Sequence, residues 1–222
     1  MRVTPPQPSI SQASDHARDD RRRRTRALLA GGLVLGLGAA VTLAAWNDSE
    51  FATGEFTAGA FNLEGSTDGT TFADHDTLGT AAVVTFTTPF DNLAPDDVVY
   101  APFWVRLDDT TTTGADLVVG SLTTTDGTPG NAANLSWTVY QLASATDTCD
   151  ATGVAAGTSL ATGATLASAP TITSGTVTLT EGATAGTPGA AQQLCIVVTA
   201  GAGLTQSGSA VATWEFAATS TV

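Results

Sequence analysis

The sequence contains no lysine, and histidine and cysteine each occur only twice in its 222 residues. Histidine is the commonest general base in enzymes, and lysine supplies amine nucleophiles. The motifs H-E-x-x-H, G-x-S-x-G, G-x-x-x-x-G-K-[ST] and C-x-x-C are all absent, which argues against zinc peptidases, serine hydrolases, phosphate-binding loops and dithiol redox sites. Paired carboxylates alone can hydrolyse glycosides, so an acidic chain leaves that one reaction open. We predict a protein that is not an enzyme and has no cofactor.

Basic residues are also scarce beyond residue 26, because seven of the eight arginines lie within residues 1–26 and only Arg106 follows. The arginines precede an apolar run over residues 27–44, and small residues follow it. A positive segment, an apolar run and small residues form the three-part pattern of a signal peptide. We therefore predict a cleavable signal helix within residues 1–44, after a long polar lead, and a secreted or cell-surface protein.

The cleavage site follows from small residues at the end of the apolar run. Thr42 and Ala44 occupy the −3 and −1 positions of an A-x-A-like site, so the mature chain is expected to begin at Ala45, with cleavage after Ala45 left open. The run of 18 residues is near the lower limit for spanning a bilayer, so an uncleaved anchor is the alternative. Contact with a membrane is expected only through that segment.

Removal of the signal would leave a strongly acidic chain. Three of the 21 acidic residues lie within residues 1–44, so 18 remain against the single Arg106, a formal charge of −17. Nucleic acids and anionic membrane surfaces are bound mainly through lysine and arginine. The mature protein is therefore expected to bind neither, and its charge would keep it dispersed in solution.

The remaining residues, 45–222, are rich in Thr, Ala, Gly and Val and show apolar residues alternating at period two between turns. This pattern is typical of half-buried strands in an all-β domain. We predict a single β-sandwich of the jelly-roll type with about eight strands. A segment poor in large apolar residues, 143–170, is expected to be a long loop with room for a short hairpin. The predicted strands are 55–63, 81–88, 98–107, 116–124, 135–142, 172–180, 192–199 and 209–218.

Two kinds of polar site remain to be considered. Cys149 and Cys195 both survive signal removal and would meet an oxidising environment, so they are predicted to form a structural disulfide around a loop of 46 residues. Asp74, His75 and Asp76 are the most ligand-like cluster in the sequence, but no further anchor with metal-site spacing follows them. A polar turn is the alternative, and no metal site is predicted elsewhere.

The junction after the apolar run resembles a known family. Thr42-Leu43-Ala44, the following Ala45-Trp46-Asn47-Asp48-Ser49-Glu50-Phe51, and Thr57-Ala58-Gly59-Ala60-Phe61-Asn62-Leu63 resemble the TasA/camelysin-like secreted proteins of actinobacterial type. These carry a signal peptide cut by a dedicated SipW-type signal peptidase. The stretch Leu93-Ala94-Pro95-Asp96-Asp97 is similar to the family's L-x-P-G-D turn, with Asp96 in place of the glycine. The ending Thr213-Trp214-Glu215-Phe216 also looks similar.

The resemblance implies an exported jelly roll whose relatives polymerise into biofilm-matrix fibres through strand donation. An edge strand with unpaired backbone groups can accept an extended segment from a neighbour. The donor candidate here is the segment 45–56, with Trp46 and Phe51 as anchors beside Asp48 and Glu50. The alternative is that this segment forms the first strand of its own sheet.

Two other functions are possible for such a domain. Camelysin-type relatives are described as peptidases, but no metal-ligand spacing in this sequence supports that role. A jelly roll can also present loops to carbohydrate, and Tyr100, Trp104 and Tyr140 are candidates for stacking on sugar rings. A secreted binding module is therefore the alternative to a structural fibre subunit.

Overall fold

The computed structural model describes residues 19–32, 50, 52–55 and 58–221. The chain divides into two compact units, Met1–Phe56 and Thr57–Val222. In the first unit, residues 19–32 form a helix with exposed side chains. Within the described ranges, no helix has the length and apolar character needed to cross a bilayer. The predicted cleavage residues Thr42, Ala44 and Ala45 lie outside the described residues.

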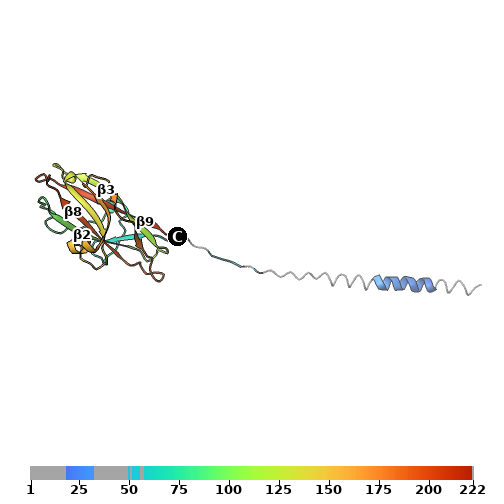
Figure 1. The fold of residues 1–222 in the computed structure, drawn as a ribbon. Helices are drawn as coiled ribbons and strands as arrows, with labels where there is room; N and C mark the ends of the chain where they lie inside the picture. The colour runs from blue at the N-terminus through green and yellow to red at the C-terminus, as the bar shows by residue number, and fades with distance from the viewer. Residues whose placement is uncertain (1–18, 33–49, 51, 56–57, 222) are drawn as a thin grey trace, which may run out of the picture. The chain divides into compact units, whose positions relative to one another are not determined.

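The second unit is an all-β sandwich of two antiparallel sheets, as the alternating pattern predicted (Figure 1). Strands β2 and β8 belong to the larger sheet, and β3 and β9 to the smaller one. The larger sheet has the order β1 (Leu63–Ser66), β2 (Val98–Leu107), β8 (Gln192–Ala200), β4 (Leu135–Gln141), β5 (Thr158–Gly163) and β6 (Thr171–Ile172). The smaller sheet has the order β7 (Val177–Leu179), β3 (Ala115–Asp126) and β9 (Ala210–Ser220).

The core lies between the two sheets and is filled by alternate residues of their strands. Along β4, Leu135, Trp137 and Val139 are buried, as the alternation predicted. Along β9, the inner residues Ala212, Trp214 and Phe216 pack against this core. Each fully buried aliphatic or aromatic side chain contributes roughly 1.5–3 kcal/mol. The other buried core residues include Val99, Ala101, Phe103, Val105, Leu107, Leu117, Val119, Leu194, Ile196 and Val198.

The predicted disulfide between Cys149 and Cys195 is present. Cys195 lies on the outer face of β8, where a second apolar cluster forms around it with Leu142, Cys149 and Val197. Helix α2 (Ala151–Ala156) follows directly, and the Asp150 side chain caps it by accepting hydrogen bonds from two of its backbone N–H groups. Strand β8 is therefore buried on both faces, which explains its nearly continuous apolar sequence.

Several predicted boundaries were wrong. The segment 143–170 is not only a loop, because it contains α2 and β5, which pairs with β4 and buries Leu160 and Ala161. The strand predicted over 172–180 is divided into β6 and β7. The strand predicted over 55–63 is present only as β1, at Leu63–Ser66. No strand is assigned over 81–88, all of which is described.

The strand order identifies an incomplete jelly roll. In an eight-stranded jelly roll, one sheet has the order 2-7-4-5 and the other 1-8-3-6. The order β2-β8-β4-β5 matches the first sheet, and β9-β3-β7 matches the last three strands of the second. Among the described residues, no strand pairs with the edge of β9 that faces away from β3. No described strand therefore takes the place of the first jelly-roll strand beside β9.

Candidate functional site

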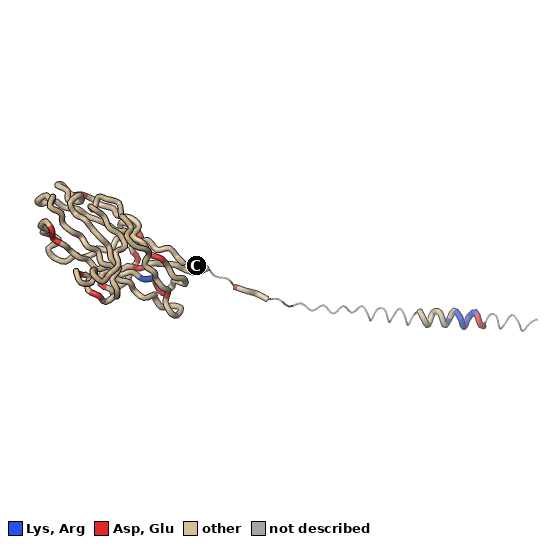
Figure 2. Tube along the Cα trace, in the orientation of Figure 1, with Lys and Arg blue, Asp and Glu red and all other residues tan. Residues whose placement is uncertain are grey.

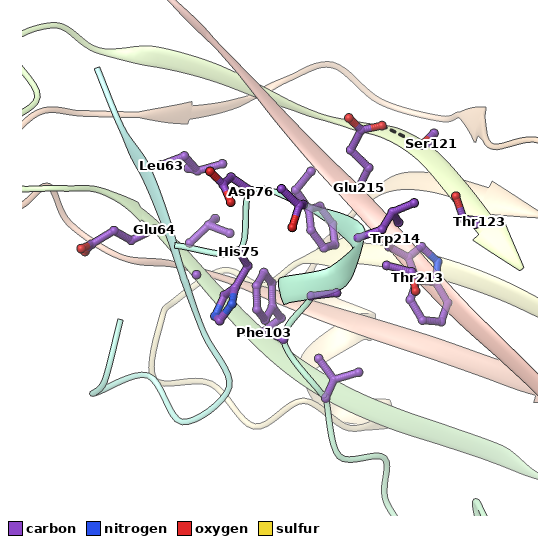
Figure 3. A pocket seen from close by; sticks show the side chains of 18 of the residues that line it. Leu63, Glu64, His75, Asp76, Phe103, Ser121, Thr123, Thr213, Trp214 and Glu215 are labelled. Atoms are coloured by element: carbon purple, nitrogen blue, oxygen red, sulfur yellow. Dashed lines mark hydrogen bonds between the residues drawn. The ribbon is translucent and has the colours of Figure 1, made fainter. Parts of the chain in front are cut away.

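A groove of about 580 Å³ lies beside the unpaired edge of β9 (Figure 3). On one side Figure 3 shows Thr213, Trp214 and Glu215 of β9, and on the other Leu63, His75 and Asp76. Phe103 of β2 lies between them and stacks on Phe216 with ring centroids 5.5 Å apart. Further apolar lining comes from Phe61, Leu78, Ala82, Val84, Val105, Ile196, Ala212 and Phe216.

The groove is lined by both faces of β9. Ala212 and Trp214 belong to the inner face of the strand, whereas Thr213 and Glu215 belong to its outer face. The outer face is also held to β3, where the Ser121 hydroxyl donates to Glu215 Oε2 at 2.6 Å. A groove that runs along the edge of a strand is lined by residues of both faces of that strand. The lining residues therefore indicate that the groove follows the edge of β9. The backbone N–H and C=O groups along this edge are the polar groups that an added strand would pair with.

Trp214 carries an unused hydrogen-bond donor beside the groove. Its indole packs edge-on against Trp137, with ring centroids 6.1 Å apart, and lies 6.3 Å from the ring of Phe86. The Nε1–H group is enclosed and has no hydrogen-bond partner among the described residues. Leaving such a buried donor unpaired costs about 1–3 kcal/mol.

Residues 81–86 form the opposite border of the groove. Ala82, Val84 and Phe86 pack against the core, while Val83 between them is 86% exposed. This alternation is that of a strand, but the six residues make no backbone hydrogen bond to any residue that the structure describes. The free edge of β9 and the unpaired residues 81–86 therefore border one groove, whose lining is partly apolar and partly polar.

The predicted donor segment belongs to the first unit. Its described residues, Glu50 and residues 52–55, are exposed and are not part of any strand. Trp46, Asp48 and Phe51 lie outside the described residues. Both alternatives for this segment, a donor strand or the first strand of its own sheet, therefore stay predictions.

The three metal-ligand candidates have separate surroundings. Asp74 Oδ1 accepts a hydrogen bond of 2.8 Å from the Asn62 side-chain amide. His75 donates from Nδ1 to the Thr80 carbonyl at 2.9 Å, and Asp76 lines the groove. In the part of the chain that the structure describes, no group of three or more His, Cys, Asp or Glu side chains is placed to hold a metal ion.

The three aromatic candidates for sugar stacking contact the protein itself. Trp104 donates from its indole nitrogen to the Ala145 carbonyl at 2.8 Å, and its ring lies against Gly69, whose φ is +71°. Tyr100 and Tyr140 pack on the outer cluster around the disulfide. All three are half-buried and none lines the groove. Tyr100 and Tyr140 therefore lie on the same outer cluster, away from the groove, and stacking on a sugar stays a prediction.

Two carboxylates have lowered pKa values because they accept several hydrogen bonds. Backbone N–H groups of Thr71 and Thr70, with the Ser66 hydroxyl, hold the pKa of Asp68 well below its ordinary value. Burial raises the pKa of Asp108, but hydrogen bonds from Thr111, Thr110 and Asn62 outweigh it and lower the pKa. Both side chains fix turns next to β1 and β2, so their role is structural.

Positive charge is confined to one place in the sandwich (Figure 2). Arg106 on β2 donates from Nε and Nη2 to Glu64 of β1, both at 3.0 Å, and its guanidinium lies 3.9 Å from the centre of the Phe72 ring. Arg106 therefore fastens β1 to β2 and is not available to bind an anion. The acidic residues are spread over the sandwich (Figure 2), and Glu64, Asp116, Asp126 and Glu215 among them lie on strands.

The sequence did not predict the groove. It predicted both of its borders, since the strand over 209–218 corresponds to β9 and alternation was found over 81–88. The sequence did not predict that these two borders are left unpaired, because alternation does not specify which strand lies beside another. No family model, curated protein or solved structure matches the chain.

Proposed function

We propose that this protein is a secreted structural subunit of the cell surface or extracellular matrix that assembles into fibres. In this proposal each copy donates its N-terminal segment, 45–56, to the groove beside β9 of the next copy. The observation that carries the proposal is the edge of β9 beside the groove, with which no described strand pairs. An added strand would pair with the edge of β9 and cover the apolar groove.

The occupant is inferred from the part of the chain that lies outside the sandwich. The segment 45–56 has 12 residues, and β9 has 11. At a rise of about 3.3 Å per residue, an extended segment of this length would reach along the whole strand. Its described residues are unpaired, so they are free to add to a second copy. The resemblance of this junction to TasA-like proteins supports the same assignment.

Export is proposed on two grounds. The arginine-rich lead and apolar run follow the pattern of a signal peptide, which a SipW-type signal peptidase would remove. The disulfide between Cys149 and Cys195 is of the kind that persists in oxidising compartments. Removal of the signal would also free the start of the donor segment, so cleavage and assembly would be linked.

The first experiment compares two purified, disulfide-oxidised chains, one starting at Ala45 and one at Glu55. We expect filaments from the longer chain only, seen by electron microscopy and light scattering. The shorter chain would still accept a strand but could not donate one. Added at low proportion to the longer chain, it should therefore shorten the filaments. Monomers from both chains at high concentration would contradict the proposal.

A groove variant tests the acceptor side. Ala212→Trp places a large side chain in the groove and is expected to abolish filaments while the chain remains folded by circular dichroism. Thr178→Trp adds the same side chain at an exposed position on β7, the opposite edge of the same sheet, and is the matched control. Equal loss of filaments in both variants would count against the groove as the acceptor.

A further inference from the structure

The sequence of residues 81–86 is that of a strand, but the structure gives it no pairing partner. The stretch Ala-Ala-Val-Val-Thr-Phe alternates inward and outward, with Val84 and Phe86 on the core and Val83 exposed. Sequences whose local preference disagrees with the observed structure are expected at functional sites. Here the preference is for a β-strand, and the strand that pairs with it would come from another molecule. The inner side chains of the stretch pack on the core, so a partner strand would have to pair with one of its edges. The groove lies along this stretch and is the place for such a partner.

Both ends of this stretch are held in place. Before it, Thr77 and Thr80 form a reciprocal capping box around the short helix η1 (Leu78–Thr80), and His75 bonds to the Thr80 carbonyl. After it, Thr87 donates its backbone N–H to the Tyr100 carbonyl of β2, and its hydroxyl accepts from the Tyr100 N–H. A stretch fixed at both ends, with free backbone groups between, is already arranged as an edge.

We propose that residues 81–86 are a second pairing edge of the acceptor groove. The inserted strand would hydrogen-bond to β9 on one side and to residues 81–86 on the other. The inference rests on the proposed function, and the occupant is the same N-terminal segment of a second copy. Insertion would enlarge the smaller sheet from three strands to five, because both the donor and residues 81–86 join it.

The proposal specifies which backbone groups are paired. Successive residues of a strand direct their N–H and C=O groups to opposite edges, so every second residue of 81–86 faces the inserted strand. In filaments of the chain starting at Ala45, we expect hydrogen exchange of every second amide in this stretch to slow by at least about tenfold relative to the unassembled chain. Slowing at the edge of β9 without slowing at residues 81–86 would overturn the second edge and leave the proposed function intact.

Cysteine pairs test the same geometry, with the native disulfide left intact. Single cysteines at Ser49 or Thr53 of one copy should cross-link, in filaments, to Thr85→Cys and also to Thr213→Cys of another copy. Thr178→Cys on β7 is the matched control and should not cross-link. Cross-links to position 213 alone would overturn the second edge. Absence of filaments in the parent chain would instead refute the proposed function itself.

The competing arrangement has residues 81–86 pairing directly with β9 and closing the groove within one copy. Adjacent strands lie about 4.8 Å apart, whereas a strand between them doubles that spacing and puts the two cysteines beyond disulfide reach. The double variant Thr85→Cys, Thr213→Cys should therefore form no bond within one chain under mild oxidation. Ready formation of that intrachain disulfide would overturn the proposal.

Discussion

Asp96 occupies a backbone conformation that usually requires glycine. Its φ is +71°, in the left-handed region, in the turn that leads into β2. The turn is held by Asp97, whose Oδ2 accepts from the Ala94 N–H, and by the Asp96 N–H, which donates to the Ala200 carbonyl. Aspartate tolerates positive φ better than most residue types, although less well than glycine.

Substitution of Asp96 should separate conformational strain from side-chain chemistry. Asp96→Ala is expected to lower the free energy of unfolding by about 1 kcal/mol, whereas Asp96→Gly should leave it unchanged or raise it slightly. Urea denaturation measures both changes. Asp109→Ala, at an exposed position, is the control and should change stability by less than about 0.5 kcal/mol. A stable alanine variant would show that the left-handed conformation carries no strain.

Asp108 links stability to acid pH. Since its pKa is lowered in the folded protein, the charged carboxylate stabilises the fold at pH values above its ordinary pKa near 3.9. This contribution is lost as the pH falls through the lower folded pKa. Asp108→Asn should cost about 1–3 kcal/mol at pH 7 through weakened hydrogen bonds to the Thr110 and Thr111 N–H groups.

The variant should also have a flatter stability profile below pH 4 than the parent, which thermal unfolding across pH values would measure. A profile parallel to that of the parent would mean that other carboxylates control acid unfolding. Asp68 is fully exposed and has the same direction of shift, so it contributes to the acid sensitivity of the parent and the variant alike.

At the scale of elements, the disulfide joins the loop before α2 to the central strand β8. Closing a loop of 46 residues is expected to stabilise the fold by about 3–4 kcal/mol, mainly by restricting the unfolded chain. The disulfide also holds α2 against the outer cluster, on which Tyr100 and Tyr140 pack. The core between the sheets has no part in this cluster.

Cys149→Ser, Cys195→Ser should therefore lower the free energy of unfolding by about 3–4 kcal/mol while the sandwich still folds. Guanidinium denaturation gives the stability, and tyrosine fluorescence and near-ultraviolet circular dichroism report the outer cluster. Val154→Ala, a partly buried residue packed on the same cluster, is a control that removes apolar contact but keeps the bond. Complete unfolding of the double serine variant would show that the outer cluster is needed for the sheets.

On the scale of the whole molecule, removal of residues 1–44 would leave a chain with a formal charge of −17 beside the acceptor edge that we propose for fibre formation. Copies brought together in a filament would repel one another, and salt screens charges separated by more than about 8–10 Å at ionic strengths near 0.1 M. Arg106 does not offset this repulsion, since it is already paired with Glu64. Charge is therefore expected to set the threshold for assembly.

Assembly should accelerate with salt. Between about 10 mM and 300 mM sodium chloride we expect the lag time of filament formation to fall several-fold, measured by light scattering on the chain starting at Ala45. The chain starting at Glu55 is the control and should remain monomeric at all salt concentrations. Slower assembly with rising salt would indicate that attraction between opposite charges drives the contact between copies. It would contradict a contact made by strand pairing and opposed by charge repulsion.

The sequence by itself determined the all-β class, most strand positions and the disulfide. Alternation is a local property, so it located β2, β4, β8 and β9 and the faces that Trp137 and Trp214 present. The pairing of Cys149 with Cys195 followed because only two cysteines exist. Strand β5 was not predicted because its residues are mostly small and give only a weak alternation of apolar and polar residues. This segment forms a strand because it pairs with the edge of β4.

Only the tertiary structure decided which strand edges are left open. Strand order depends on contacts between residues far apart in the chain, and no local pattern records it. Residues 81–86 have the sequence of a strand, and the fold leaves them unpaired across a groove from β9. The candidate site therefore consists of backbone edges beside a groove, which exist only once the two sheets have been assembled.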